Sequence, residues 1–216
     1  MVAFDVIETL FSLEPLRSRL ESAGLPGHLL ETWFAQLLRD GFALSATGVY
    51  RPFRDVATAG LERLFDSETV DSAQIDRIIS GFAELDAHPD AAPAIQLLHD
   101  AGLRIVTLTN GSASVTERLL ERAGLRDRVE RMISVDEVKR WKPHQEVYLH
   151  RASVVEVEPR HLALIAAHPW DIHGARRAGL MAGYVGRDGK PFPSIMDAPH
   201  VTGVTLVEVA EQLVAG

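Results

Sequence analysis

Polar residues follow predicted strands at four places in the sequence, and their side chains are of types that can do chemistry. Asp5 follows the first apolar run, and the polar stretch Thr109–Ser112 follows a β-branched run. Lys142 precedes a proline at a predicted helix start, and the fourth stretch runs from His168 to Asp171. Backbone N–H groups before a helix, as in the second stretch, suit an anionic substrate group. The four stretches together indicate one polar site for a small anionic substrate.

Each stretch also has an ordinary structural explanation. Asp5 could simply end a strand, Thr109–Ser112 could cap a helix, and Lys142 could be a solvated lysine before a helix. Asp171 could cap a helix that begins at residue 172. No single stretch therefore establishes a function, and their order along the chain carries the argument.

Strands and helices alternate over most of the sequence. Apolar and β-branched runs predict strands, and apolar residues with helical spacing predict helices. The predicted strands span residues 2–6, 104–109, 132–135, 162–166, 181–185 and 203–206. The predicted helices between them span 92–101, 114–124, 143–153, 172–178 and 207–214, with Ser114 and Glu117 as a capping box. This alternation predicts an α/β fold with a doubly wound parallel sheet.

A helical segment interrupts this alternation directly after the first strand. Three apolar stripes predict helices over residues 28–40, 53–65 and 72–85, and none of them alternates as a strand would. We therefore expect an α/β core formed by residues 1–11 and 89–216, and an inserted helical cap formed by residues 12–88. Ligands of such sheets bind at the carboxyl ends of the strands, so a cap inserted there would cover the site.

Composition argues against several classes of function. The 216 residues include no cysteine, which rules out disulfides, thiolate metal sites and cysteine nucleophiles. The formal net charge of -8 disfavours nucleic-acid binding, and no apolar run reaches the roughly 18 residues of a transmembrane helix. No basic leader precedes Asp5. We therefore expect a cytoplasmic protein with no nucleic-acid or membrane partner, and the sequence leaves a homodimer open.

The four polar stretches resemble, in order, the four motifs of the haloacid dehalogenase superfamily. Phe4–Leu10 resembles the first motif and Leu108–Ser112 the second, while Lys142–Tyr148 is similar to the third and Ala166–Asp171 to the fourth. The resemblance covers nearly the whole chain, and the helical segment falls where the family's helical cap belongs. It implies a Rossmann-like core with a helical cap, and a hydrolase with an aspartate nucleophile.

The resemblance also implies a role for each candidate residue. Asp5 would be the nucleophile, because a desolvated carboxylate that faces a bound electrophile can attack it. Lys142 and Asp171 would complete the catalytic set, and Lys142 would orient Asp5 and offset its negative charge. The candidates for substrate binding are Thr109, Asn110, Ile7, His168 and Arg39.

Two departures from the family's pattern bear on the reaction. The family's phosphatases carry a second aspartate two residues after the nucleophile, where this chain has Ile7. In a phosphatase the leaving group is an alkoxide, and its protonation by an acid accelerates the reaction about 10²- to 10⁴-fold. Isoleucine cannot supply this proton. A halide leaves without one. Metal-dependent members carry a further acid where this chain has Ala167, which leaves Mg²⁺ few oxygen ligands. Both departures favour metal-independent cleavage of a carbon–halogen bond.

Other departures count against simple 2-haloacid dehalogenation. Ala166 and His168 stand where the dehalogenases have a small polar residue and an asparagine, and Glu8 replaces a glycine of the first motif. Those enzymes also carry a cap arginine that receives the halide. Its candidates in this chain are Arg39, Arg51 and Arg54.

The sequence therefore predicts a haloacid dehalogenase-like hydrolase that attacks a small 2-haloacid through Asp5 and needs no cofactor. Two alternatives stay open. One is a Mg²⁺-dependent small-molecule phosphatase of the same superfamily. The other is a binding protein with little turnover that keeps the fold, since a fold does not fix a function.

Overall fold

A six-stranded parallel sheet forms the centre of the computed structural model, which describes residues 1–65 and 71–215. The order of its strands is β5-β4-β1-β6-β7-β8, and every neighbouring pair is parallel. The strands are β1 (Val2–Phe4), β4 (Ile105–Thr109), β5 (Arg131–Ser134), β6 (Ala163–Ala166), β7 (Met181–Val185) and β8 (Val201–Gly203). The chain order reverses on either side of β1, and ligands bind at such switch points.

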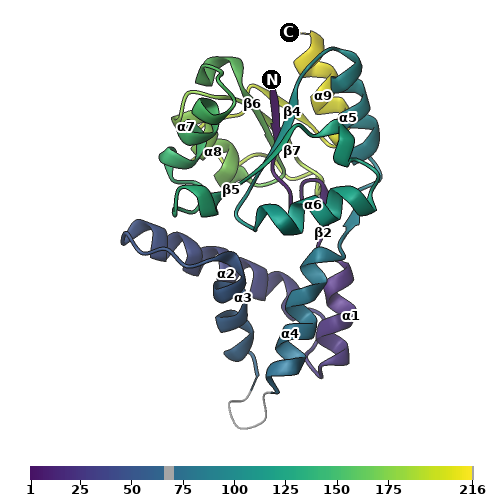
Figure 1. Cartoon of the computed structure of the whole chain (residues 1–216), viewed down its shortest axis with the longest axis vertical. Coiled ribbons are helices and arrows are strands. Elements are labelled where there is room, and N and C mark those ends of the chain that lie inside the picture. Colours follow the sequence, from purple (N-terminus) through teal and green to yellow (C-terminus); the bar gives the residue numbers. More distant parts are fainter. Residues whose placement is uncertain (66–70, 216) are drawn as a thin grey trace.

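Helices cover both faces of this sheet (Figure 1). One face carries α5, α6 and α9, and the other carries α7 and α8. Side chains of β1 alternate between the two faces, so Phe4 joins the first apolar cluster and Ala3 joins the second. The helix bounds are α5 (Ala91–Asp100), α6 (Ala113–Arg122), α7 (Gln145–Val154), α8 (Pro169–Arg177) and α9 (Leu206–Ala215). The doubly wound fold predicted from the sequence is confirmed.

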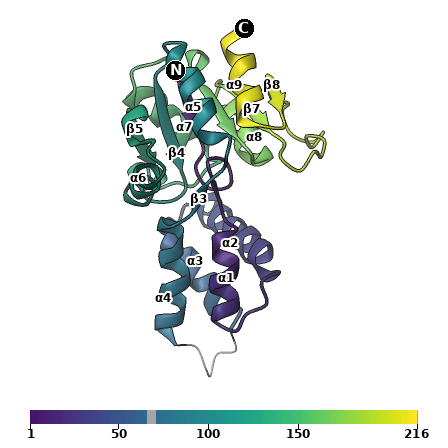
Figure 2. The same ribbon diagram turned by 90° about the vertical axis from the view of Figure 1, so that its right-hand side faces the viewer.

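In the part of the chain that the structure describes, four α-helices between β1 and α5 form a separate layer below the sheet, which we call the cap (Figures 1 and 2). The two chain segments that join the cap to the core pair as antiparallel strands, β2 (Phe11–Ser12) and β3 (Asp86–Ala87). This strand pair lies next to the domain boundaries that we proposed at residues 11/12 and 88/89. The cap helices are α1 (Pro15–Ser22), α2 (Leu29–Ala46), α3 (Phe53–Glu62) and α4 (Ser72–Ser80). Among the described residues, no helix is both long and apolar enough to cross a membrane.

Some helix ends differ from those that the sequence predicted. The hydroxyl of Ser112 caps α6 and accepts a hydrogen bond from the amide of Val115, so the capping box at Ser114 and Glu117 was wrong. The spacing chose Ser114 because Glu117 follows it by three residues, whereas the hydroxyl of Ser112, 3.2 Å away from that of Ser114, makes the cap. α7 begins at Gln145 rather than at the predicted residue 143.

Two further elements begin earlier than predicted. β8 spans residues 201–203, so the strand expected at 203–206 was placed too late, and α9 already begins at Leu206. α8 begins at Pro169, which suits the first turn because proline has no amide hydrogen to leave unpaired. Asp171 therefore lies inside the first turn of α8 instead of capping it, and its charge is favourable there.

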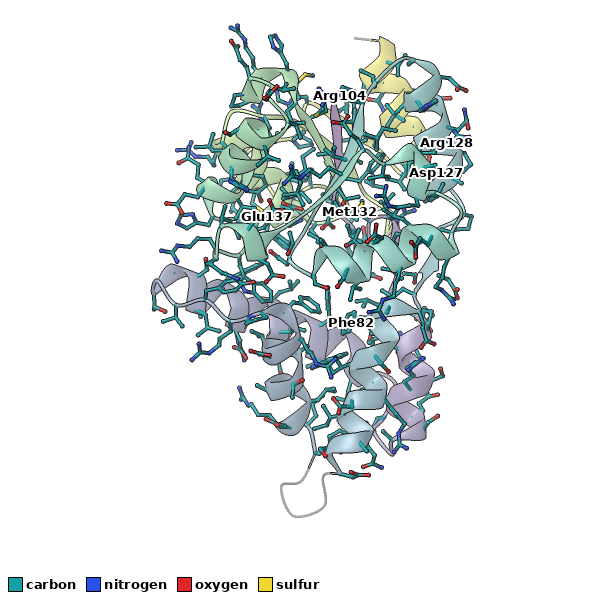
Figure 3. The ribbon with its side chains drawn as sticks, viewed as in Figure 1. Phe82, Arg104, Asp127, Arg128, Met132 and Glu137 are labelled. Carbon is teal, nitrogen blue, oxygen red and sulfur yellow. The ribbon has the colours of Figure 1, made fainter. Side chains whose placement is uncertain are left out.

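Trp141 holds the cap against the core. Its indole N–H donates to the carbonyl of Arg51 over 2.9 Å, and its backbone N–H donates to Ser45 Oγ over 3.2 Å. Its ring also stacks on Phe53, with ring centroids 5.8 Å apart. Phe82, in the turn after α4, lies at the same boundary (Figure 3). The cap is therefore closed over the carboxyl ends of the strands.

We expect Gly41→Ala to destabilise the protein by about 1–3 kcal/mol, which is typical of added volume in a packed interior. A Cβ atom at Gly41 of α2 would lie 2.5 Å from the ring of the fully buried Trp141. At an unhindered helix position the same change stabilises by about 1 kcal/mol. Urea denaturation should show the loss, with Ala43→Gly, at an exposed interior position of the same helix, as the measure of helix propensity. A more stable Gly41→Ala variant would contradict the close contact.

Candidate active site

Asp5, Lys142 and Asp171 meet at the carboxyl end of β1. The ammonium nitrogen of Lys142 donates hydrogen bonds to Asp5 Oδ1 over 2.7 Å and to Asp171 Oδ2 over 2.6 Å. Its third hydrogen bond goes to the carbonyl of Leu108 over 2.9 Å. All three charged residues are buried, with exposed fractions of 4%, 0% and 0%. The structure thus brings together the three residues that the resemblance made catalytic candidates.

The sheet and its loops position this cluster. The amide of Asp5 donates to the carbonyl of Ile165, so β6 fixes the backbone of Asp5 where β1 ends. The amide of Lys142 donates to Asn110 Oδ1 over 2.9 Å, which ties the lysine to the loop after β4. Because parallel strands end at one edge of a sheet, residues that lie far apart in the sequence converge there.

The remaining carboxylate oxygens also have donors. The hydroxyl of Thr9 donates to Asp5 Oδ2 over 2.7 Å, and accepts from the amide of Ala167 over 2.9 Å. The hydroxyl of Tyr148 donates to Asp171 Oδ1 over 2.6 Å. We did not predict roles for Thr9 and Tyr148, although both lie inside the stretches that resemble the first and third motifs. Both carboxylates are therefore fixed in orientation through both of their oxygens.

Burial and neighbouring charges have opposite effects on the pKa values of Asp5, Lys142 and Asp171. Burial raises the pKa of Asp5, but the charges of Lys142 and His168 and the hydrogen bonds from Lys142 and Thr9 outweigh it, so the pKa falls below its ordinary value of 3.8. Burial raises the pKa of Asp171 above its ordinary value despite Lys142. Burial lowers the pKa of Lys142, but the two carboxylates outweigh it and raise this pKa. At neutral pH Asp5 is therefore a carboxylate and Lys142 an ammonium.

A small cavity adjoins Asp5 between cap and core. Its volume is about 10 Å³, which is room for about one water molecule. The cap supplies an apolar wall, and the core supplies the polar groups. The lining residues are Asp5, Ile7, Phe34, Leu38, Phe53, Thr109, Asn110, Gly111, His168 and Trp170. A substrate larger than water must therefore displace part of this lining when it binds.

Four of the predicted substrate-binding residues line this cavity, and one does not. Ile7, Thr109, Asn110 and His168 are in its wall. Arg39 is exposed, forms an ion pair with Asp40 over 2.8 Å and is not part of the wall. The structure therefore does not support a substrate-binding role for Arg39, because its side chain lies on the outer surface of α2. Arg51 and Arg54 are also outside the lining.

Apolar residues of the cap and of α8 form most of the rest of the cavity wall. Phe34, Leu38 and Phe53 line the cavity from α2 and α3, and Trp170 lines it from α8. Phe34 also follows the helical spacing of the apolar residues that pack the cap interior. A cavity wall and a packed core both select apolar residues at this spacing, so the pattern could not separate them.

The donor set at Asp5 does not fit a Mg²⁺ ion. The ammonium group of Lys142 lies between Asp5 Oδ1 and Asp171 Oδ2, at hydrogen-bond distance from both. A dication that bound these two oxygens would be held against this positive charge. Ala167 supplies no further oxygen ligand from its side chain. Within the described residues, no three histidine, aspartate or glutamate side chains lie close enough together to hold a metal ion.

The strand order around β1, the cap inserted after it, and the carboxylates around a buried lysine define a capped α/β fold with a charged site where the strand order reverses. The model of the haloacid dehalogenase-like hydrolase family matches residues 1–179. The chain belongs to this family, which confirms the resemblance of its four motifs.

Individual relatives agree with this assignment. The chain is 27% identical over 194 residues to (S)-2-haloacid dehalogenase 1 of Pseudomonas sp. (strain CBS-3), which covers 87% of this chain and 85% of that protein. The structure of L-2-haloacid dehalogenase from Xanthobacter autotrophicus matches with a TM-score of 0.89 and 23% identity, over 98% of this chain and 97% of that one. A structure of that dehalogenase with chloropropionic acid covalently bound matches with a TM-score of 0.86 and 22% identity, over the same shares.

Proposed function

We propose that this hydrolase is a dehalogenase that cleaves the carbon–halogen bond of a small 2-haloacid through an ester on Asp5. The observation that carries the proposal is a buried, ionised Asp5 in a cavity that pairs it with Ile7 instead of a proton donor. A halide needs no proton to leave, whereas an alkoxide does. The relatives named as haloacid dehalogenases support the same reaction class.

The first step is a displacement at carbon. An oxygen of Asp5 attacks the carbon that bears the halogen, the new C–O bond forms, and the electron pair of the carbon–halogen bond leaves with the halide. We assign the carboxylate of the substrate to the loop Thr109–Ser112, where α6 begins. Asn110 Oδ1 already accepts from Lys142, so its NH₂ group is the part of the amide that can donate to this anion.

The second step hydrolyses the ester. Water attacks the ester carbon Cγ of Asp5, the bond from the acyl carbon to the substrate oxygen breaks, and a 2-hydroxyacid and the Asp5 carboxylate result. The attacking water must lose a proton to a base. We assign this role to Asp171, the second carboxylate beside Asp5, with which it shares Lys142. Asp171 is buried and outside the cavity lining, so the water must displace part of that lining to reach it. Ester formation removes the charge of Asp5, so Lys142 then faces a single carboxylate.

The proposal includes no cofactor. The ammonium of Lys142 holds both carboxylates that a metal-dependent phosphatase would use, and this disfavours the Mg²⁺-dependent alternative. The substrate would be a small monoanion, because a small molecule displaces the least of the confined cavity's lining. A cytoplasmic location is part of the proposal, and it rests on the composition of the chain.

Halide release from a panel of haloacids tests the function. We expect the protein to release chloride or bromide from chloroacetate or from one enantiomer of 2-chloropropionate or 2-bromopropionate. Excess EDTA should leave the rate unchanged, because no step needs a metal. The same preparation should not hydrolyse phosphate esters with or without Mg²⁺. Phosphate release that depends on Mg²⁺, without halide release from any haloacid, would refute the proposal and favour the phosphatase.

A further inference from the structure

The proposed displacement at carbon has a fixed direction. An oxygen of Asp5 approaches the carbon from the side opposite the halogen, so that oxygen, carbon and halogen lie nearly in one line. Asp5 follows β1 at the carboxyl edge of the sheet, and the cap lies beyond that edge (Figures 1 and 2). The line from Asp5 through the carbon therefore ends at the cap, and the halide leaves in that direction.

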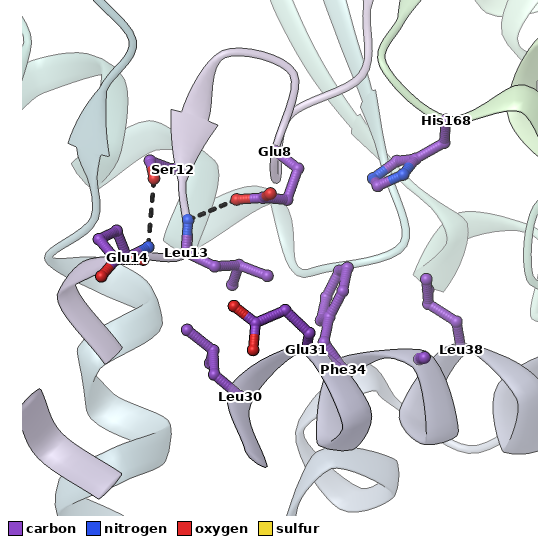
Figure 4. Close-up of a pocket in the computed structure, with 10 residues that line it drawn as sticks. Glu8, Ser12, Leu13, Glu14, Leu30, Glu31, Phe34, Leu38 and His168 are labelled. Atoms are coloured by element: carbon purple, nitrogen blue, oxygen red, sulfur yellow. Dashed lines mark hydrogen bonds between the residues drawn. The ribbon is translucent and has the colours of Figure 1, made fainter. Parts of the chain in front are cut away.

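The cap side of the Asp5 cavity is apolar. Among the described residues, the cap contributes three side chains to the lining, Phe34 and Leu38 of α2 and Phe53 of α3, which we call the cap wall. None of the three has a polar side-chain atom. Figure 4 shows the side chains of Phe34 and Leu38 rising from α2 towards the core. A halide that leaves towards the cap therefore meets a hydrocarbon surface.

The charged lysine and the imidazole next to Asp5 lie on the side of the nucleophile. Lys142 donates to Asp5 Oδ1 and to Asp171 Oδ2. Nε2 of His168 lies 3.8 Å from Asp5 Oδ2. Both groups neighbour the attacking carboxylate and belong to the core, so the carbon separates them from the departing halide.

Two cap arginines that could receive a halide are held elsewhere. Arg39 forms an ion pair with Asp40. Arg54 forms one with Asp76 over 2.6 Å, and it lines an adjoining cavity of about 140 Å³ instead. No lysine or arginine belongs to the described lining of the Asp5 cavity. The cap arginine expected from the resemblance therefore has no counterpart in that lining.

An apolar wall discriminates between halides. A small anion is hydrated more strongly than a large one, because its charge is confined to a smaller radius. Its transfer to a surface without hydrogen-bond donors therefore costs more free energy. A large, polarisable halide also gains more dispersion energy from contact with carbon. Such a wall disfavours chloride relative to bromide and iodide, in addition to the ordinary difference in carbon–halogen bond strength.

We propose that the departing halide rests against the cap wall, and that this wall makes the enzyme selective for 2-bromoacids and 2-iodoacids over 2-chloroacids. This inference rests on the proposed function, because it names the leaving group of that reaction. The electron pair of the carbon–halogen bond leaves with the halide, and no proton is transferred in this step. Phe34, Leu38 and Phe53 thus determine specificity through contact with the leaving group.

The first experiment measures kcat/KM for the reacting enantiomers of 2-bromopropionate and 2-chloropropionate. The reference is the ratio of the rates at which acetate in water displaces bromide and chloride from the same acids, since that ratio already contains the bond strengths. We expect the bromide-to-chloride ratio of the enzyme to exceed the reference by at least about 10-fold, as for a polar group that is buried without a partner. A ratio equal to the reference would overturn the inference, while halide release itself would still support the proposed function.

Two substitutions of Leu38 separate the polarity of the cap wall from its shape. Leu38→Gln adds an NH₂ donor on the cap side and should lower the bromide-to-chloride ratio by about 3- to 10-fold. Leu38→Met keeps the wall apolar and should keep the ratio of wild type. Leu38 is only half-buried, so both variants are compatible with the fold. Equal ratios for the two variants would count against the cap wall.

Arg54→Gln tests whether an arginine receives the halide instead. Arg54 is exposed and pairs with Asp76, so we expect this variant to keep the ratio of wild type. If Arg54 turned into the cavity during turnover, its loss would penalise chloride most and raise the ratio. A raised ratio in Arg54→Gln would therefore overturn the inference.

The position of the halogen can also be observed directly. In crystals of Asp5→Asn with 2-bromopropionate, the anomalous scattering of bromine locates the leaving group before its bond breaks. We expect the bromine in contact with Phe34 and Leu38. Bromine beside His168 or on the loop Thr109–Ser112 would overturn the inference even where wild type releases halide. Bromine at the cap wall without halide release by wild type would refute the proposed function and leave the position of the halogen as inferred.

Discussion

Asp5→Asn is expected to abolish halide release, with kcat/KM reduced by at least about 10⁴-fold, as for the loss of a covalent nucleophile in other hydrolases. The amide has nearly the same shape as the carboxylate, and its oxygen can still accept from Lys142. Its NH₂ group replaces the oxygen that accepts from Thr9, and it can donate to the Thr9 hydroxyl instead. The amide lacks the negative charge that the attack on carbon requires. The loss should therefore affect chemistry while the fold is kept.

Isotope labelling distinguishes this role from a merely electrostatic one. During turnover in ¹⁸O-labelled water, the label should enter the carboxylate of Asp5, because water attacks its Cγ atom and the original oxygen leaves in the product. Mass spectrometry of the peptide that contains Asp5 reads this directly. Asp40→Asn is the control, because Asp40 is a surface aspartate of α2 paired with Arg39. An Asp5→Asn variant as fast as wild type, or label in the product alone after a single turnover, would refute the assignment.

Lys142→Met should be the most destabilising single change in the site, at about 3–5 kcal/mol, the usual cost of breaking a buried ion pair by removing one partner. Methionine fills the volume of the lysine stem but leaves Asp5 and Asp171 buried side by side without a cation. Activity should be lost as well, because the carboxylate of Asp5 would no longer be held or kept ionised. Urea denaturation and halide release measure the two effects.

The pH dependence of this loss has a definite sign. In wild type the lowered pKa of Asp5 stabilises the fold above pH 3.8, and that contribution is lost as the pH falls through the lowered pKa. The raised pKa of Lys142 stabilises the fold below pH 10.5, and that contribution is lost as the pH rises through the raised pKa. Without the ammonium, burial would raise the pKa values of both carboxyl groups. Lys142→Met should therefore gain stability relative to wild type as the pH falls from neutral.

Two further variants make the lysine experiment specific. Lys142→Met/Asp171→Asn should recover part of the lost stability, because it removes one of the two uncompensated charges. Lys190→Met, at a lysine whose side chain is 79% exposed, should change stability by no more than about 0.5 kcal/mol. A Lys142→Met protein as stable as Lys190→Met at neutral pH would contradict the buried ion pairs.

The sequence predicted the convergence of Asp5, Lys142 and Asp171 because parallel strands end at one edge and the order of the stretches matched a known pattern. It could not choose Ser112 over Ser114 as the cap of α6, since both are serines near one helix start. Arg39 was a candidate for substrate binding because the sequence shows that it carries a charge. The direction of its side chain on α2 depends on packing, which the sequence does not show. The contact of Trp141 with Gly41 joins residues far apart in the chain, and no local pattern encodes it.

The size of the cavity at Asp5 has a consequence for the timing of the cycle. A chamber with room for about one water molecule cannot hold the organic acid and the second reactant together in this closed form. The halide must leave the cavity before the water that hydrolyses the ester can reach it. The chemistry itself orders the two half-reactions, because the ester exists only once the halide has left, and the confined cavity shields the bound haloacid from other nucleophiles until its bond to Asp5 has formed.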